Sequence, residues 1–218
     1  MSAPRTSDWL TPVALVALSV IPAIAGALRL LQLGAGAGIT EDNARFLAAP
    51  IPVVVHIVSS LVFSILGAFQ FSAALRRIKP SWHRAAGRIL VPCGAASALS
   101  ALWMTQFYIT PEFDGGVALY AVRLLAGSAM AVSLLLASRA IRTRDISAHR
   151  AWMLRAYALG LAAGTQVFTH LPWFLFPTIH GELARTLSMT AGWGINLAVA
   201  EWIISRQRPS HATLGRPR

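Results

Sequence analysis

Six long apolar runs constrain what this chain can fold into more than any other feature of its sequence. They cover roughly residues 10–33, 51–75, 87–108, 116–139, 150–174 and 186–205. A helix needs about 20 mostly apolar residues to cross a hydrocarbon layer of about 30 Å, and each run reaches that length. With 56% hydrophobic and 12% charged residues, the chain is also too apolar for a soluble domain of 218 residues. We therefore expect an all-α, polytopic membrane helical bundle with six transmembrane helices over residues 1–205.

The first run needs a separate test, because Ala25, Gly26 and Ala27 after an apolar stretch resemble a signal-peptide cleavage site. The apolar pattern continues beyond them through "LRLLQLG". We therefore expect the whole run to be retained as a helix.

The distribution of basic residues predicts the orientation. Segments 1–9, 76–88, 139–150 and 206–218 carry 1, 5, 4 and 4 Lys or Arg, whereas 34–50, 109–115 and 175–185 carry only Arg45 and Arg185. Positive residues near a membrane stay on the cytoplasmic side, so both termini are predicted to lie inside, an N-in/C-in topology. This pattern fits a multi-pass protein of the bacterial cytoplasmic (inner) membrane. The polar, Pro-containing segment 206–218 is predicted to be a disordered cytoplasmic tail.

The net charge of +11 does not indicate nucleic-acid binding, because the basic residues lie in short loops and a tail. Anionic lipid headgroups on the cytoplasmic side are the expected partner instead. The single cysteine, Cys93, lies inside the third run and excludes an internal disulfide.

Ionisable side chains inside apolar runs are costly to bury, so each one marks a candidate site. At about 1.5 Å of helix per residue, one group falls near the external face: His56, Arg123 and His170. His56 is the strongest single candidate, because a histidine one or two turns deep in a membrane needs a hydrogen-bond or metal partner. A second group falls near the cytoplasmic face and contains His83, His149, Gln70, Arg155 and Glu201.

Arg155 and Glu201 carry opposite charges at comparable depth, so we expect them to form an ion pair between the fifth and sixth helices. Such a pair either holds the two helices together or acts as a proton site, and Gln70 and Asn196 are grouped with it. The amides Gln106 and Gln166 are expected to hydrogen-bond between helices.

Histidines on neighbouring helices are also what a b-type haem protein needs, since two imidazoles ligate the iron and arginines pair with the propionates. His83 and His149 each open a helix within a His-Arg-Ala triplet, and they are the expected iron ligands of an inner haem b. The full candidate set for cofactor binding is His83, His149, His56, His170, Arg123 and Arg155. The expected function is transmembrane electron transfer, with a quinone or another redox partner.

Two other functions stay open. A proton-coupled or small-solute transporter is compatible with buried charges and with a weak parallel repeat of helices three–four and five–six. No broken helix or midplane charge is predicted, which argues against transport. A non-catalytic membrane scaffold is the second alternative. No HExxH, CxxC, GxSxG or Gly-rich phosphate loop is present to support zinc proteolysis, thiol redox chemistry, serine hydrolysis or nucleotide binding.

The segments "HIVSSLVFSILGAFQF", "WHRAAGR", "AHRAWMLRAYAL" and "WGINLAVAEW" together resemble the bacterial family of predicted membrane proteins called domain of unknown function 2306, or DUF2306. The matching residues are His56, Gly67, Gln70, His83, Gly87, Arg88, His149, Arg150, Met153, Arg155, Asn196 and Glu201. The resemblance implies a membrane fold of about six helices and no particular reaction. Its histidines on helices two, three and five are similar in outline to those of cytochrome b561 and the ferric-reductase-like membrane haem proteins.

Overall fold

All regular structure in the described part of the chain is helical, which confirms the predicted all-α class. The computed structural model describes residues 7–36, 38–109, 116–176 and 178–207. Its elements in chain order are α1 (Ser7–Gly34), α2 (Ala44–Ala48), α3 (Pro50–Ala68), the 3₁₀ turn η1 (Phe69–Phe71), α4 (Ala73–Ile78), α5 (Pro80–Phe107), α6 (Val117–Arg142), α7 (Ile146–Gly160), α8 (Ala162–Thr169), α9 (Leu171–Leu175) and α10 (Glu182–Gln207). Most of the predicted tail, from residue 208, lies outside the described residues.

Within the described ranges, four helical segments are long and apolar enough to cross a membrane by length and composition. They are Trp9–Gly34, Pro50–Phe71, Pro80–Phe107 and Val117–Arg142. The first four predicted runs coincide with these segments. The protein is therefore embedded in a membrane through several apolar helices, while the predicted number of six spans goes beyond what this criterion shows.

The fifth apolar run, which the sequence predicts as one helix, is divided into three helical segments in the structure. Helix α7 ends at Gly160, α8 begins at Ala162, and α9 follows a second break at His170. One turn before the first break, the carbonyl of Ala158 accepts a hydrogen bond of 3.0 Å from Nδ2 of Asn196 in α10. A side chain from a distant helix therefore supplies a hydrogen bond to a backbone carbonyl near the break. A local sequence pattern cannot reveal such a partner.

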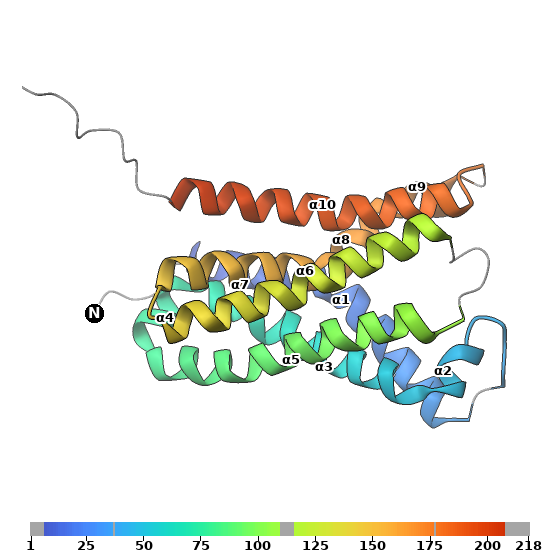
Figure 1. The fold of residues 1–218 in the computed structure, drawn as a ribbon, viewed down its shortest axis with the longest axis horizontal. Helices are drawn as coiled ribbons and strands as arrows, with labels where there is room; N and C mark the ends of the chain where they lie inside the picture. Colours follow the sequence, from blue (N-terminus) through green and yellow to red (C-terminus); the bar gives the residue numbers. More distant parts are fainter. Residues whose placement is uncertain (1–6, 37, 110–115, 177, 208–218) are drawn as a thin grey trace, which may run out of the picture.

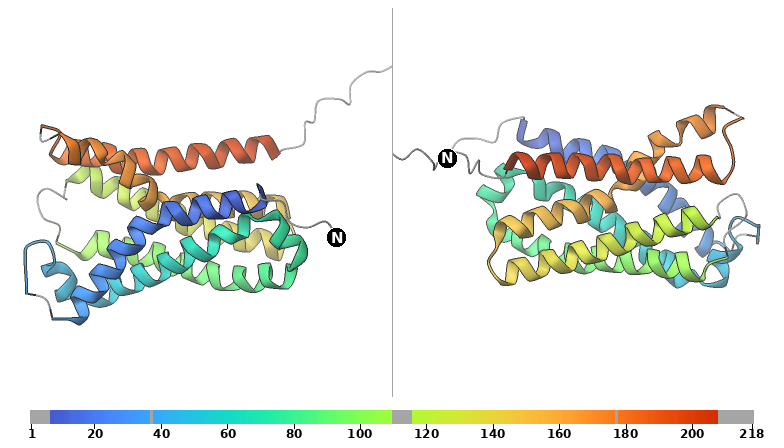
Figure 2. Two further views of the ribbon diagram at one scale, coloured as in Figure 1. Left: turned by 180° about the vertical axis from the view of Figure 1, so that it is seen from behind. Right: turned by 45° about the horizontal axis from the view of Figure 1, so that its top comes forward.

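The long helices run side by side along one axis (Figure 1). Helix α7 packs closely against α6 and also against α10, α3 and α5. Helix α1 packs against α3 and α8, while α10 covers α7 and α8 (Figure 2). The second half of α7, including Leu154 and every residue from Ala156 to Leu159, is buried. A helix that is buried on all sides lies inside a bundle, so α7 forms its centre.

One end of the bundle collects the basic turns, and we call it the basic end. It contains the α4–α5 turn and the α6–α7 turn (Figure 1). Its basic residues are Arg76, Arg77, Lys79, Arg84, Arg139, Arg142, Arg144 and Arg150. The α6–α7 turn is tight because Arg144 adopts a left-handed φ of 60°. The amide of Asp145 then reaches the carbonyl of Ala140 at 2.9 Å, which is the hydrogen bond of a Schellman motif.

A single aromatic ring fixes the relative height of α5 and α7. Phe63 of α3 is only 1% exposed and lies between glycines of the two helices. A Cβ added at Gly94 of α5 would approach this ring to 2.7 Å, and one added at Gly160 of α7 would approach it to 2.9 Å. No real side chain tolerates such contacts, so both glycines are needed for Phe63 to occupy this position.

Candidate functional site

The contact with Phe63 also sets the positions of the two His-Arg-Ala histidines. Gly94 follows His83 by eleven residues, and Gly160 follows His149 by the same number. Eleven residues make about three turns with only about 20° of excess rotation, so each histidine lies on the same face as its glycine, about 16 Å nearer the basic end. Because both glycines contact one ring, His83 and His149 lie at matching height on facing sides of α5 and α7.

The ring of His149 is held by the helix that precedes it. Its Nδ1 lies 2.9 Å from the carbonyl oxygen of Ala137 in α6. A carbonyl oxygen only accepts hydrogen bonds, so Nδ1 carries the hydrogen and Nε2 keeps its lone pair. The tight α6–α7 turn brings the two residues together. His149 therefore offers Nε2 as a ligand nitrogen or proton acceptor.

His83 lies close enough to His149 for an electrostatic interaction between the two side chains. Its Nδ1 is buried and has no hydrogen-bond partner among the described residues. A second buried atom in the described part of the chain, Nε2 of Gln70, has no partner either. Buried polar groups are normally paired, so these two atoms are candidates for contact with a bound polar group.

Ring contacts of its two neighbours locate Gln70 in the bundle. Its neighbour Phe69 makes an edge contact with Trp82 of α5, with ring centroids 6.5 Å apart. Its other neighbour, Phe71, packs on Tyr157 of α7 at 4.9 Å. The 3₁₀ turn η1, which carries Gln70, therefore contacts both α5 and α7.

There is free space on the α5 side of this site. Gly87 lies one turn above His83 on the same face, and a Cβ placed on it would meet no atom within 4 Å. Helices α5 and α7 contact each other only lightly, whereas α6 packs extensively against both. A ligand next to His83 would therefore find open space at Gly87.

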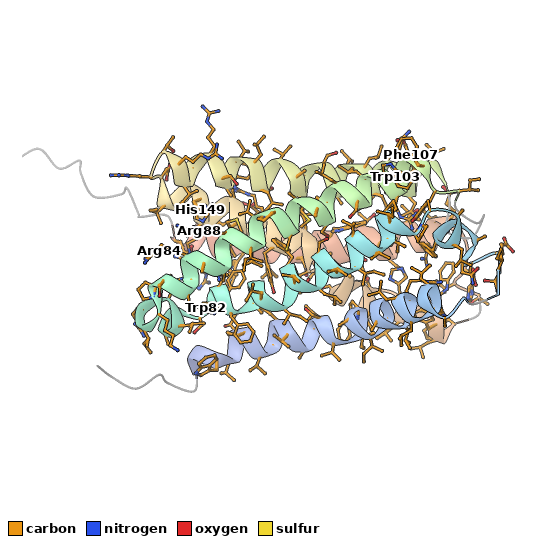
Figure 3. The ribbon with its side chains drawn as sticks, turned by 90° about the horizontal axis from the view of Figure 1, so that it is seen from below. Trp82, Arg84, Arg88, Trp103, Phe107 and His149 are labelled. Atoms are coloured by element: carbon orange, nitrogen blue, oxygen red, sulfur yellow. The ribbon has the colours of Figure 1, made fainter. Side chains whose placement is uncertain are left out.

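The surroundings of the histidine site are strongly positive. Arg76 and Arg84 both act electrostatically on His83. Figure 3 shows Arg84, Arg88 and His149 gathered at one end of the bundle, with Trp103 and Phe107 at the other. An anionic group bound at the basic end would therefore be stabilised by guanidinium charge.

The predicted external cluster is distributed over different helix interfaces. Nδ1 of His56 lies 3.0 Å from the carbonyl oxygen of Ser97, which joins α3 to α5. Nδ1 of His170 lies 2.7 Å from the carbonyl oxygen of Gln166 in its own segment, and α8 packs mainly on α10 and α1. Arg123 of α6 donates to the sulfur of Met189 in α10 at 3.8 Å. The three residues thus serve separate contacts.

Arg155 and Glu201 form a two-point ion pair between α7 and α10. Nε of Arg155 lies 2.5 Å from one carboxylate oxygen and Nη2 lies 2.9 Å from the other. The guanidinium also stacks on Trp152 at 4.4 Å. Asn196 extends this seam toward the middle of the bundle, where its Oδ1 accepts from Thr165 at 2.7 Å. This geometry ties α7 and α8 to α10 and faces away from the two histidines.

Sequence reasoning missed several residues that shape the site. Arg76 lies in α4, and only the fold brings it near His83. The role of Phe63 was missed as well, although the equal spacing from His83 to Gly94 and from His149 to Gly160 was a visible signal. That spacing extends the weak internal repeat by three helical turns.

The fold defines a class: a helical membrane protein with several apolar helices, in which His83 and His149 lie near each other at the basic end. A family model described as "Predicted membrane protein (DUF2306)" matches residues 53–204. The chain belongs to this family, as the sequence resemblance indicated. No curated protein and no solved structure matches the chain.

Proposed function

We propose that this protein holds a b-type haem between α5 and α7 at the basic end and acts as a membrane electron carrier. The observation that carries the proposal is the facing pair of imidazoles. His149 is anchored through Nδ1 to Ala137 at 2.9 Å, and Nδ1 of His83 is buried without a partner in the described structure. Two such imidazoles from different helices are the axial ligands that a low-spin haem takes.

The surrounding residues fit this group. The macrocycle would lie beside Gly87, where a Cβ meets no atom within 4 Å, so α5 leaves room for a flat ligand. Leu90, two turns from His83, and Met153, one turn from His149, supply apolar surface. Arg76 and Arg84 supply positive charge for propionates, in place of the predicted Arg123 and Arg155, whose side chains are engaged elsewhere. A haem held in this way takes up and releases one electron at a time.

The proposal places the electron donor or acceptor at the basic end. The arginine-rich turns favour the cytoplasmic side of a membrane for this end. A quinone, or a redox protein that docks on the basic turns, fits this position. The proposal requires a single haem, because His56 and His170 take part in different helix interfaces.

An absorption spectrum tests the proposal directly. The full chain, produced with ample haem supply and purified in detergent, is expected to show a Soret band and, after dithionite reduction, a sharp alpha band. The expected stoichiometry is one haem per chain, measured by pyridine haemochrome. Absence of both bands under conditions that load a control cytochrome would contradict the proposal.

One observation favours transport as a second candidate function. The break between α7 and α8 interrupts a segment that the sequence predicts to be continuous, and discontinuous helices are common at transporter binding sites. The ion pair of Arg155 and Glu201 lies on the same segment. A transport mechanism would use the Glu201 carboxylate as its proton site.

Glu201→Gln separates the two functions. The Glu201 side chain is 50% exposed, and glutamine has nearly the same shape as glutamate, so we expect the variant to keep the fold. Its haem bands should match those of the wild-type protein. Proton-coupled solute uptake into proteoliposomes by the wild-type protein, abolished in Glu201→Gln, would instead support transport.

A further inference from the structure

A cavity lies at the basic end, on the side of α7 that faces away from the two histidines. Its volume is about 500 Å³, and it lies between the first turns of α7 and the last turn of α10. Cavities of roughly 300–1,000 Å³ hold small ligands. The residues that line it are Asp145, Ile146, Ser147, Ala148, Arg150, Ala151, Trp152, Arg155, Ile204 and Gln207.

The cavity carries one free charge of each sign. Arg150 is exposed and makes no hydrogen bond or ion pair with any residue in the described ranges. Arg155 is neutralised by Glu201. Asp145 uses Oδ1 to accept the amide of Ala148 at 2.9 Å, so its second oxygen is available. A ligand that is matched to this cavity carries both an anionic group and a cationic group.

The position of the cavity indicates a lipid. Apolar side chains are exposed on both helices: Ile146 in the lining is 60% exposed, and Trp202 of α10 is 55% exposed. Trp152 forms part of the wall, and tryptophan is typical of the boundary between hydrocarbon and headgroups. Acyl chains can therefore lie along α7 and α10 while a headgroup enters between the helix ends.

We propose that this cavity binds the zwitterionic headgroup of a phosphatidylethanolamine lipid. The phosphate pairs with Arg150 and accepts from the amide of Gln207, while the primary ammonium donates to Asp145 and the hydroxyl of Ser147. A quaternary ammonium has no N–H to donate, and a glycerol headgroup has no positive charge. The site therefore selects ethanolamine lipids over choline and glycerol lipids. This proposal is independent of haem binding.

Native mass spectrometry of the full chain, released from detergent with equimolar dioleoyl phosphatidylethanolamine and phosphatidylcholine, tests the proposal. We expect one retained ethanolamine lipid, preferred about fivefold, which corresponds to about 1 kcal/mol. Asp145→Asn keeps the helix cap but removes the charge, and Arg150→Gln removes the cation. Each variant should reduce the preference to about one. Arg142→Gln, an exposed arginine of the basic end outside the cavity, serves as the control and should leave it unchanged.

Three results would overturn the proposal. Equal retention of the two lipids by the wild-type chain would show that the site does not select ethanolamine lipids. Stronger retention of phosphatidylglycerol in a parallel experiment would show that the site recognises only the negative charge of the headgroup. An unchanged preference in both Asp145→Asn and Arg150→Gln would place the lipid elsewhere. None of these results bears on the haem bands, so the two proposals fail separately.

Discussion

His83→Ala and His149→Ala are each expected to abolish the Soret and alpha bands of the purified protein. His83 and His149 would together hold the haem, so removal of either imidazole would take away one of its two protein ligands and is expected to release it during purification. His170→Ala is the matched control, because Nδ1 of this residue bonds to Gln166 within its own segment. Its spectrum should remain that of the wild type. Wild-type bands in both His83→Ala and His149→Ala would reject the assignment.

A rescue experiment distinguishes ligand loss from misfolding. His83→Gly leaves a hole beside Gly87, where a Cβ would meet no atom within 4 Å. Added imidazole can occupy this hole and restore the axial bond. We therefore expect the bands to reappear with imidazole at millimolar concentration. A variant that elutes as a folded monodisperse species yet stays colourless with imidazole would contradict a ligand role for His83.

Phe63→Ala is expected to destabilise the bundle by about 3 kcal/mol, since this ring is fully enclosed between α5 and α7. Loss of helicity during titration with sodium dodecyl sulfate, followed by circular dichroism, measures the change. Phe168→Ala is the control, because that ring is 59% exposed and should cost less than about 0.5 kcal/mol.

The effect of Gly160→Ala on stability is expected to change sign when Phe63 is absent, and this change tests the contact more sharply than either single variant. Gly160→Ala in the wild-type chain forces a Cβ to within 2.9 Å of Phe63, and overpacking of this kind costs about 1–3 kcal/mol. In the Phe63→Ala background the ring is gone, and alanine should stabilise the helix by roughly 0.5–1 kcal/mol relative to glycine. Additive effects of the two substitutions would show that Phe63 does not set the height of α7.

Much of the fold follows from the sequence because hydrophobic length is a local property. Each of the first four apolar runs lies within a few residues of a helix that is long enough to span a membrane. The fifth run shows the limit of this reasoning. Its residues are mostly apolar, yet the helix is interrupted at Leu161, close to the Ala158 carbonyl that Asn196 of α10 binds.

The candidate site was only partly predictable. The His-Arg-Ala repeat indicated His83 and His149 as a pair at one depth, and the structure brings them within electrostatic reach. The prediction that His56, Arg123 and His170 form one group depended only on their depth along each helix. Depth does not fix rotation around the helix, and His56 turns toward Ser97 of α5 while His170 bonds within its own segment.

By itself the sequence determined the helical class, the membrane environment, the basic end and the repeat that places two histidines at equal depth. These properties depend on composition and on spacing along single helices. Only the tertiary structure decided which faces meet. Phe63 aligns α5 with α7 through Gly94 and Gly160, and η1 packs against both helices through Phe69 and Phe71. Such contacts join residues that are far apart in the chain, and their energy comes from complementary shape, which no single segment contains.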